Sequence, residues 1–434
     1  MAYAFVTKVK NIKEHSNADS LKLGECFGNQ VVIDLDVEEE AMGVYFPTDT
    51  QLGKEYAEKN NLLRKKDENN INIGGYLDAD KRNIRALKLR GEVSDGLFMS
   101  LESLSQFINI YSLKEGDNVD ILNGIVIAQK YIPKHVQLVK TSNSSKNQKG
   151  KKLLDIISYP NFREHKDTKQ FAYNMNAFKK GDLLTVSLKM HGTSGISMMA
   201  KQITRYKTTL LNKLLFKLKL KNETKEEYKL VSGSRRVILK NFTGGFYGDN
   251  NFRKKYHDDF DGKLLKGETV YYEIVGYTGK GDQTIMSKCS NSKTHDKEFI
   301  KKYGKETIFS YGCDVGENDI YVYRMTMTNE DGNVVEYSTS LIQQRCEQMN
   351  VKFVLVFKQF FFDNLLQLQS VIDEFVDGID EIGKTHIKEG VVIRIENKQV
   401  FTAYKHKNTN FKILEGIIKD TGIVDIEEME EDFI

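Results

Sequence analysis

A lysine at the entrance to a tight turn is the feature of this chain that most directly suggests covalent chemistry. The segment SLKMHGTSG, residues 187–195, ends an apolar run at Lys189 and continues through His191, Gly192 and Ser194. A lysine amine becomes a nucleophile where neighbouring cations or a metal ion favour its uncharged form. Taken alone, the pattern K-x-x-G is frequent by chance, and a solvated lysine before a turn explains it better.

Charged and aromatic residues within strand-like apolar runs follow this lysine in a fixed order. They are Arg235 in SGSR, Glu273 in YYEIVG, Tyr323 in YVYR, Glu389 and Arg394 in EGVVIR, and Lys405 and Lys407 in AYKHKN. Lys405 and Lys407 are two residues apart, which places them on one face of a strand. A charge inside an apolar strand is costly to bury without a partner, but charges that converge on a cleft can partner one another and a nucleotide. An edge strand facing water explains each residue singly, but not all of them in this order.

These segments resemble the nucleotidyltransferase motifs of covalent ligases and capping enzymes. The wording KMHGTS, SGSR, YYEIVG, YVYR, EGVVIR and YKHKN is similar to that of template-directed RNA ligases, as is the preceding segment FREHKDTKQF, residues 162–171. Within residues 17–98, NADSL, VYFPTDTQL and KLRGEVSDGLF resemble the OB module that one RNA-ligase family carries before its catalytic domain, a signature that tRNA-binding modules share. The resemblance covers nearly the whole chain except residues 140–152, 204–229 and the acidic tail.

The resemblance implies an ATP-dependent RNA ligase that joins a 3′-OH end to a 5′-phosphate end, with sealing of nicks in duplexes during RNA repair as the expected task. In such enzymes the lysine takes AMP from ATP, AMP passes to the 5′-phosphate, and the 3′-OH then displaces it. The implied cofactors are ATP and Mg²⁺ or Mn²⁺. The implied partner is RNA, or an RNA/DNA hybrid, presenting ends or nicks.

The resemblance also implies a role for each motif residue. Lys189 would carry AMP, and Glu389 would hold the metal ion or its waters. Glu273 would bind a ribose hydroxyl or a second metal water. Lys405 and Lys407 would bind the nucleotide and neutralise the charge that develops on the α-phosphate.

The remaining motif residues would contact the nucleotide or the nucleic acid. Tyr323 would stack on adenine, and Arg235 would hold a phosphate or a ribose. In the lysine turn, Gly192 would shape the nucleotide site, and His191 and Ser194 would touch phosphate or a metal-bound water. His191 could equally serve only the turn. Arg394 would also contact phosphate.

Two positions depart from the family pattern. Leu188 stands where many relatives have Glu, so only a main-chain contact is expected there. Arg324 follows Tyr323 where some RNA ligases have Asp, which removes a carboxylate role at that position.

The elements that must position these residues divide the chain at a polar segment. Residues 1–139 contain short strand-like runs separated by turns, which favours a small β-barrel of the OB type, although an SH3-like barrel has a similar pattern. Residues 140–152, KTSNSSKNQKGKK, have linker composition. Residues 153–434 mix strand-like runs with helical stretches at 209–221 and 364–382, as expected for an α+β domain on an antiparallel sheet. The resemblance makes this a nucleotidyltransferase domain with an ATP-grasp-like sheet.

Composition and charge exclude few classes of function. The 434 residues carry a net charge of only +3, too little to indicate a nucleic-acid partner by itself. No apolar run is long enough to span a membrane, and the four cysteines form no CxxC pair. We therefore expect a soluble, cytoplasmic protein with reduced thiols and no membrane partner.

The segment 201–221 contains lysines and no acidic residue, with an apolar stripe of leucines at helical spacing. It fits either the outer face of a packed helix or a face that follows phosphates. The tail from Asp425 is acidic and is expected to be a solvated end.

Two other functions fit parts of the pattern. A DNA ligase or a capping guanylyltransferase would use the same motifs, but KMHG replaces the K-x-D-G common in those groups. An RNA-binding protein with an OB module and a decayed transferase domain is the non-enzymatic alternative. The intact lysine, the two glutamates and the lysine pair argue against decay.

Overall fold

A computed structural model describes residues 3–66, 72–132, 156–207, 209–239, 242, 247 and 251–420. The predicted linker at 140–152 and the acidic tail lie outside the described residues. The chain divides into two compact units, Met1–Gln137 with Thr409–Gly422, and Leu138–Asn408 with Ile423–Ile434. The sequence-based boundary assigned 409–422 to the C-terminal domain, so the two divisions differ for that segment.

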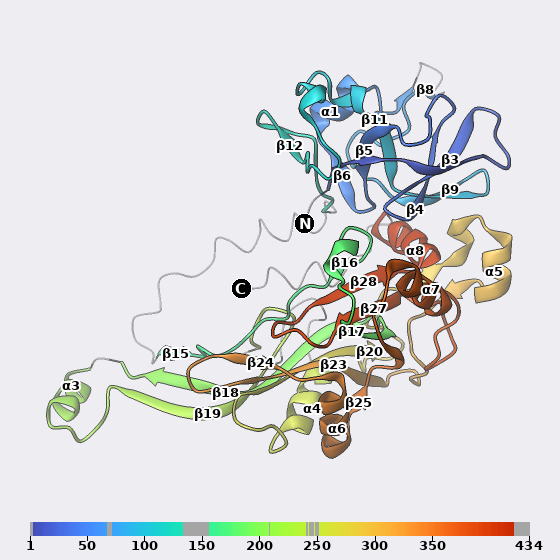
Figure 1. The fold of residues 1–434 in the computed structure, drawn as a ribbon. Helices are drawn as coiled ribbons and strands as arrows, with labels where there is room; N and C mark the ends of the chain where they lie inside the picture. Colours follow the sequence, from blue (N-terminus) through green and yellow to red (C-terminus); the bar gives the residue numbers. More distant parts are fainter. Residues whose placement is uncertain are drawn as a thin grey trace. The chain divides into compact units, whose positions relative to one another are not determined.

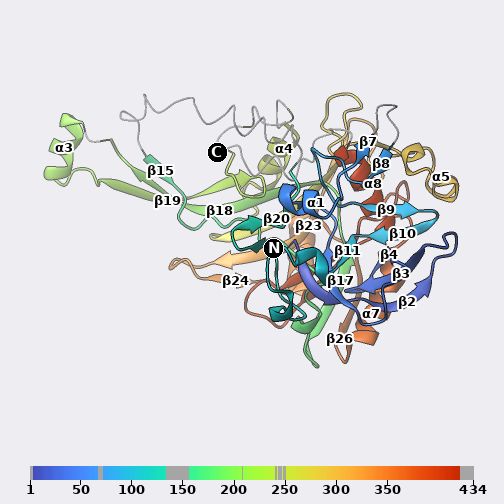
Figure 2. The same ribbon diagram turned by 90° about the horizontal axis from the view of Figure 1, so that it is seen from above.

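The N-terminal unit is built from short strands (Figures 1 and 2). In the described part, three-stranded sheets have the orders β1-β5-β11 and β2-β3-β4, with bounds β1 Phe5–Lys8, β2 Lys10–Glu14, β3 Leu21–Cys26, β4 Asn29–Asp34, β5 Met42–Phe46 and β11 Leu97–Ser100. The paired strands are β6 (Thr50–Leu52) with β14 (Ala128–Lys130), β7 (Lys65–Lys66) with β8 (Asn72–Gly74), β9 (Ala86–Leu89) with β10 (Glu92–Asp95), and β12 (Ile121–Leu122) with β13 (Ile125–Val126). The short helices are α1 (Lys54–Lys59), η1 (Leu101–Leu104) and η2 (Ile110–Ser112). The OB barrel itself stays a prediction.

The core of this unit is apolar and includes a helix from the far end of the chain. Val44, Phe46 and Leu104 are fully buried in one cluster. Helix α8 (Thr409–Asp420) lies against β9 and buries Leu414 completely. Lys412 on this helix forms an ion pair with the buried carboxylate of Asp95. Residues at both ends of the sequence therefore build one core.

Two sheets form the C-terminal unit. Within the described residues, the larger sheet has seven strands: β15 (Ile156–Ser158), β18 (Thr193–Arg205), β19 (Thr224–Gly233), β20 (Glu268–Gly276), β23 (Asn318–Thr328), β24 (Val334–Glu336) and β25 (Lys352–Phe353). The second has five: β16 (Lys169–Gln170), β17 (Leu183–Leu188), β26 (Val356–Phe361), β27 (Gly390–Ile395) and β28 (Ala403–Lys407). Apart from β16 with β28 and β23 with β25, the strands in these sheets pair antiparallel. The α+β prediction is confirmed.

Helices and short strands complete this unit. They are α3 (Leu210–Lys217), α4 (Asn251–Phe260), α5 (Lys297–Tyr303), α6 (Thr339–Met349), α7 (Leu365–Val376), η4 (Met175–Ala177), η5 (Asn291–Thr294), β21 (Cys289–Ser290) and β22 (Glu306–Thr307). Asn364 is the N-cap of helix α7, and its side chain accepts a hydrogen bond from the N–H of Gln367 at 2.9 Å. It ends at Val376, before the predicted 382, because Asp377 is extended and Gly378 has φ +110°.

The connection between the two sheets places the predicted nucleophile. Strand β17 belongs to the five-stranded sheet and β18 to the seven-stranded sheet, so residues 189–192 cross from one to the other. All nine residues of β20 are buried, which makes this strand a fixed wall beside β18. The apolar cluster around Leu184, Val391 and Ile393 fixes β17 against β27 in the other sheet. The lysine turn is thus held by packing on both sides.

Candidate active site

Lys189 is held at the sheet crossing by its backbone and by its side chain. Its N–H donates to the carbonyl of Gly390 at 2.9 Å, which ties the turn to the start of β27. Its Nζ lies 2.8 Å from Oε1 of Glu389, and these side chains are 12% and 2% exposed. The lysine therefore sits at a nearly buried ion pair whose carboxylate comes from a distant part of the sequence.

The same carboxylate faces two further basic groups. Nζ of Lys407 lies 3.4 Å from Oε1 of Glu389, because Lys407 and Gly390 are paired residues of β28 and β27. Nδ1 of His191 lies 3.7 Å from Oε2, a contact that becomes an ion pair when the imidazole is protonated. Glu389 is thus the centre of a cluster with Lys189, Lys407 and His191; functional roles had been predicted for Glu389 and the two lysines, and for His191 either a contact role or a place in the turn only.

A cavity opens beside this cluster. Its lining includes these predicted residues: Lys189, Ser194, Arg235, Glu273, Tyr323, Arg394 and Lys405. His191, Gly192, Glu389 and Lys407 lie in or around the lysine turn and do not line the cavity. Leu188 lines it too, and its N–H donates to the carbonyl of Leu355 at 2.8 Å. The cavity places the lysine, a carboxylate, two arginines and a second lysine around one space.

Glu273 reaches the cavity from the buried strand β20. It is paired with Ser194 of β18, whose Oγ donates to Oε2 of Glu273 at 3.4 Å. Gly192 allows this close approach, because a Cβ there would lie 2.3 Å from the carbonyl oxygen of Ile274 and 2.9 Å from Cγ of Glu273. The turn therefore needs glycine for space, since Gly192 has no positive φ.

Tyr323 and Arg235 form another part of the cavity wall. The ring of Tyr323 meets the ring of His165 edge to face, with centroids 5.1 Å apart. Burial, and next the nearby charge of Glu273, raise the pKa of the Tyr323 phenol, so it stays neutral. Arg235 forms an ion pair with Asp167 in the segment preceding β16. His165 and Asp167 lie in FREHKDTKQF, which the sequence comparison had noted as a segment without naming residues.

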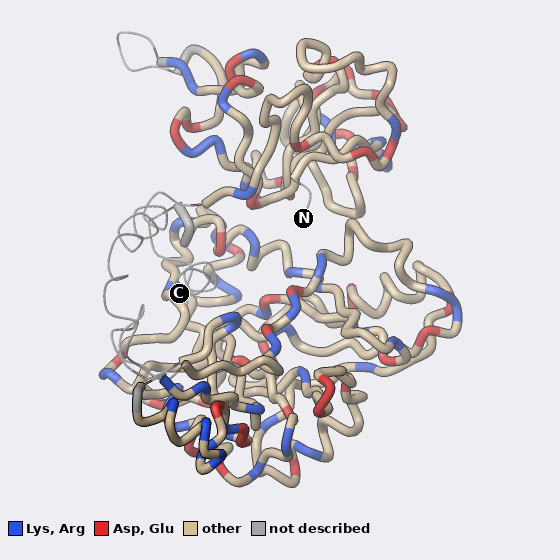
Figure 3. Tube along the Cα trace, turned by 90° about the vertical axis from the view of Figure 1, so that its left-hand side faces the viewer, with Lys and Arg blue, Asp and Glu red and all other residues tan. Residues whose placement is uncertain are grey.

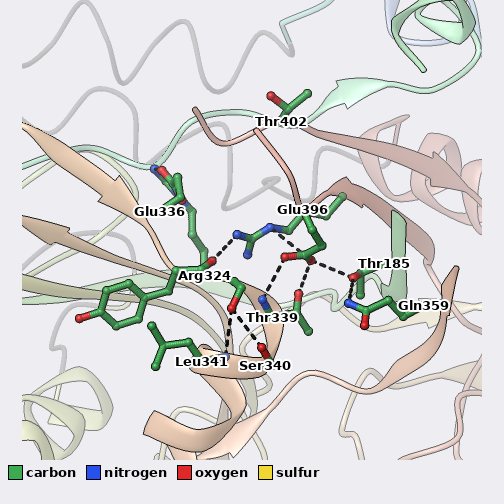
Figure 4. Close-up of polar contacts among 12 residues, drawn as sticks. Thr185, Arg324, Glu336, Thr339, Ser340, Leu341, Gln359, Glu396 and Thr402 are labelled. Carbon is green, nitrogen blue, oxygen red and sulfur yellow. Dashed lines mark hydrogen bonds and ion pairs between the residues drawn. The ribbon is translucent and has the colours of Figure 1, made fainter. Parts of the chain in front are cut away.

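The predicted arginine Arg394 joins the buried polar network around Glu396, which Figure 4 shows with Thr185 and Thr339. Its Nε lies 3.6 Å from Oε1 of Glu396, and its guanidinium donates to the carbonyl of Tyr337. Glu396 also accepts from Thr185 Oγ1 at 2.8 Å and from the N–H of Thr339 at 3.0 Å. Glu396 thus links β17 to the start of α6, and Arg394 of β27 stabilises this link through its contact with Glu396. The sequence did not indicate this structural role.

Arg324, at the departure noted in the sequence, has its own carboxylate. Its Nε donates to Oε2 of Glu336 at 2.9 Å, and its guanidinium lies 4.4 Å from the ring centroid of Tyr271 (Figure 4). Burial works to lower the pKa of this guanidinium, but the hydrogen bond that it donates to Glu336 and the neighbouring charges raise the pKa on balance. Arg324 is therefore a buried, charged residue of β23 that pairs with Glu336, in agreement with the loss of a carboxylate role at this position.

Arg253 and Tyr311 support the lysine turn and were missed from the sequence. Arg253, on α4 and 3% exposed, donates to the carbonyl of Ser194 at 2.7 Å and to Oγ1 of Thr193 at 2.6 Å. The N–H of His191 donates to Oη of Tyr311 at 2.7 Å. Arg253 sits in FRKKYHDDF, where its basic neighbours make it resemble a solvated helix face.

The candidate metal ligands are few. In the described parts of the chain, no three His, Cys, Asp or Glu residues gather closely enough to hold a metal ion. Glu389 has a buried Oε2 that accepts no hydrogen bond from the described residues. Such an oxygen suits a hard cation, and Mg²⁺ commonly uses one or two carboxylates together with substrate phosphates and waters. The residues therefore fit a metal that arrives with a nucleotide.

Solved structures of similar fold exist. A lysine-to-alanine variant of Naegleria gruberi RNA ligase with ATP and Mn aligns at TM-score 0.56 and 15% identity, covering 94% of this chain and 98% of that chain. A glutamate-to-alanine variant with AMP and Mn gives 0.57 and 15%, covering 95% and 98%. The same ligase with PPi gives 0.56 and 15%, covering 97% and 99%. This chain has the RNA ligase fold.

The similarity extends over almost the full length of both chains, whereas the sequences have diverged widely. No family model and no curated protein sequence matches this chain. The described residues contain no helix long and apolar enough to cross a membrane. At this identity the comparison establishes the fold, and the chemistry must be argued from the residues of the site.

Proposed function

We propose that this chain is an ATP-dependent RNA ligase that joins 3′-OH and 5′-phosphate ends through a lysyl-AMP intermediate on Lys189. The observation that carries the proposal is the cluster in which Lys189 and Lys407 share one buried carboxylate, Glu389, next to a cavity. The ATP, AMP and PPi named for the similar ligase structures are the substrate, the transferred group and the leaving group of this reaction.

In the first step, Nζ of Lys189 attacks the α-phosphorus of ATP. A P–N bond forms, the bond from the α-phosphorus to its bridging oxygen breaks, and pyrophosphate leaves with the electron pair. The ammonium must first lose a proton, which passes to solvent. Lys405 on the cavity wall and Lys407 beside Glu389 are placed to neutralise the charge that develops on the phosphate.

The ion pair between Lys189 and Glu389 has to break before this attack, because an ammonium held by a carboxylate is not a nucleophile. Glu389 and the bound nucleotide would hold Mg²⁺ or Mn²⁺ there, with Glu273 as a further oxygen donor, and the metal supplies positive charge at the phosphate. A Glu389 carboxylate that held such a metal would release Lys189 from its Oε1. Tyr323, an aromatic ring on the cavity wall, is placed to stack on adenine.

The second and third steps use the same cavity. The terminal oxygen of a 5′-phosphate attacks the lysyl-AMP phosphorus, the P–N bond breaks, and Lys189 takes up a proton again. The 3′-oxygen of the neighbouring strand then attacks the 5′-phosphorus, its proton passes to solvent, the bond from that phosphorus to the AMP oxygen breaks, and AMP leaves with the electron pair. Arg235 lines the cavity beside Lys189 and would orient the incoming phosphate, with Asp167 as the partner it exchanges. We expect matched nicks in duplex RNA, or in RNA/DNA hybrids, as substrates.

Self-labelling tests this proposal. The purified chain is incubated with α-³²P-labelled ATP or GTP and a divalent metal, and the label that stays on denatured protein is measured. We expect label from ATP alone, lost in Lys189→Ala and kept in the control Lys358→Ala, a surface lysine of the same unit that is 46% exposed. Label from GTP alone would favour a capping enzyme, and label persisting in Lys189→Ala would refute the assignment of the nucleophile.

Substrate class is tested separately on nicks with RNA or DNA on either side. We expect sealing wherever the strand that carries the 3′-OH ends in RNA. Equal or faster sealing of nicks made only of DNA would favour a DNA ligase. Labelling without any sealing would point to a transferase of another kind.

A further inference from the structure

A long β-hairpin, formed by β18 and β19 of the seven-stranded sheet, extends to helix α3 (Figures 1 and 2). Strands β18 and β19 pair from Ile196 with Gly233 to Arg205 with Thr224, which is roughly 30 Å of strand. Strand β20 pairs with β18 only as far as Met198, and on that side the outer part of β18 pairs only with the short strand β15, from Ile203 to Arg205, among the described residues. We call Tyr206–Glu223 at its end the arm tip.

The arm tip presents an apolar stripe to solvent. Leu211, Leu214 and Leu218 are 67%, 55% and 56% exposed, and their spacing of three and four residues places them on one face of the helix. Leu220, just after the helix, is 72% exposed. Of the two interpretations of this segment, a packed helix would cover the apolar stripe, whereas these described leucines are left exposed.

The tip is also strongly basic, and its lysines differ from those of the hairpin strands. On the strands, Lys201 pairs with Glu226, and both Lys225 and Lys229 pair with Glu227. At the tip, Lys213, Lys217 and Lys219 are exposed and have no ion pair with any described residue. Figure 3 shows lysine and arginine positions gathered on this part of the chain. Uncompensated positive charge is thus concentrated where the leucines are exposed.

This combination selects among the possible occupants. A second copy of the tip would bring like charges together, since the tip carries five lysines against one acidic residue, Glu223. A nucleic acid could bind the lysines through its phosphates, but its phosphate backbone offers no apolar surface that would bury a stripe of leucines. The surface of an anionic bilayer uses both, because an interfacial helix places its leucines among the acyl chains and its lysines near the lipid phosphates.

We propose that the arm tip binds anionic lipid surfaces as an amphipathic helix lying in the membrane interface. The proposal goes beyond the ligase function and does not depend on it. The earlier expectation of no membrane partner concerned a spanning segment, which an interfacial helix does not require. The binding would bring the enzyme to a membrane by a segment separated from the catalytic cavity by the length of the hairpin.

Vesicle flotation tests this with the full-length chain. The probes are vesicles of phosphatidylcholine alone and vesicles containing about a quarter phosphatidylserine, at roughly physiological ionic strength. We expect flotation with the anionic vesicles and little with the neutral ones. The triple variant Leu211→Ser, Leu214→Ser, Leu218→Ser should lower the bound fraction about tenfold, because each leucine contributes apolar burial. Lys213→Glu with Lys217→Glu should lower it similarly, and more salt should weaken the wild type.

The matched control is Leu366→Ser, which removes an 85% exposed leucine from α7 in the same unit and should leave flotation unchanged. Self-labelling with ATP checks folding and should be the same in every tip variant. Equal flotation of wild type and the leucine variant, or no flotation with anionic vesicles, would overturn the proposal. So would a result in which the tip variants weaken binding to a labelled RNA duplex and not to vesicles, which would make the tip an RNA contact.

Discussion

Oε1 of Glu389 lies 2.8 Å from Nζ of Lys189, so the proposed nucleophile begins the reaction cycle held by a carboxylate. Both side chains are nearly buried, and Lys407 approaches the same oxygen. Removing one partner from such a group leaves the others with unbalanced charge. The cluster therefore predicts that its members fail for different reasons when they are replaced.

Replacement of Glu389 should impair the first step through loss of the metal ligand. We expect Glu389→Gln to lower the rate of self-labelling by about 10²–10³, the loss typical when one charge-stabilising group is removed. Raised Mn²⁺ should recover part of that rate, because the amide oxygen of Gln can still contact a cation. The measurement is label per minute at several Mn²⁺ concentrations.

Replacement of Lys407 should resist that rescue. Lys407→Ala removes a cation from the phosphate side of the cluster, and we expect a loss of similar size at low metal concentration. Added Mn²⁺ should not restore the rate, because the missing group is a phosphate contact and not a metal ligand. Recovery of Lys407→Ala by Mn²⁺, with none for Glu389→Gln, would mean that the two roles are reversed.

Arg253 should act as a positioning residue for the lysine turn. It touches Ser194 and Thr193 but does not line the cavity, so we expect Arg253→Met to slow self-labelling with little change in the ATP concentration for half-maximal rate. Arg253→Lys should recover part of the rate through one restored hydrogen bond. A large change in the ATP requirement with an unchanged maximal rate would instead place Arg253 in the nucleotide site.

The site residues that the sequence revealed are those that carry a charge inside an apolar strand pattern. Glu273 and Lys405 stand out because their neighbours alternate or cluster as strand residues, and both line the cavity. Arg253 gives no such signal, since a helix with several basic residues looks solvated. Its buried position depends on how α4 packs against β18 and β19, which is a tertiary contact.

Parts of the fold were also predictable from the sequence, namely the strands whose apolar runs stand out from their neighbours. Short strand-like runs such as GVVIRI and DLLTVSLKM correspond to β27 and β17, because burial on both faces demands apolar residues. The thirteen-residue strand β18 was not recognised, because Thr193–Arg205 carries serines, lysine and glutamine. In its outer half, buried Ala200 and Gln202 alternate with partly exposed residues, and a glutamine at a buried position conceals the strand pattern. The place of α8 in the N-terminal core was also invisible, since nothing local specifies a partner so distant in sequence.

The buried His386 should make stability depend on pH. Burial lowers the pKa of its imidazole; the charge of Asp380 and the hydrogen bond with the Ile387 carbonyl only partly offset this, and the charge of His191 lowers the pKa further. An unfolded chain protonates this histidine near pH 6.5, so below that pH the unfolded state binds more protons. The free energy of unfolding should then fall with decreasing pH, by at most about 1.4 kcal/mol per unit, until the lower folded pKa is reached.

Urea unfolding followed by circular dichroism at pH 7.5 and 5.5 measures this effect. The variant His386→Gln cannot take up the proton, so it should lose less stability than the wild type between the two values. Other groups titrate alike in both proteins and cancel in the comparison. An equal loss in both proteins would show that His386 does not contribute.

Helix α8 should stabilise the N-terminal unit although it directly follows β28, the strand that carries Lys405 and Lys407. Phe411 and Leu414 are 1% and 0% exposed, and Lys412 pairs with buried Asp95. A fragment of residues 1–137 should therefore melt at a lower temperature than the same fragment with a peptide of residues 409–422 added. The peptide with Leu414→Ala should stabilise less, since a buried leucine contributes about 2–5 kcal/mol. No shift with the unmodified peptide would contradict the assignment of α8 to this unit.

The two units should separate the first step of ligation from the last. A fragment of residues 152–408 contains every site residue named above and omits α8, so it should label itself with AMP at a rate within a few-fold of the full chain. On a nick that already carries AMP at its 5′-phosphate, the fragment should seal much more slowly. We expect this because a barrel of the OB type, still a prediction for residues 1–139, binds single strands through a basic, aromatic groove and would hold the strand that ends in the 3′-OH.

Adding the 1–137 fragment in trans should not restore sealing at low concentration, because the covalent link supplies the local concentration. If the 152–408 fragment seals the adenylylated nick as fast as the full chain, the N-terminal unit does not grip the acceptor strand.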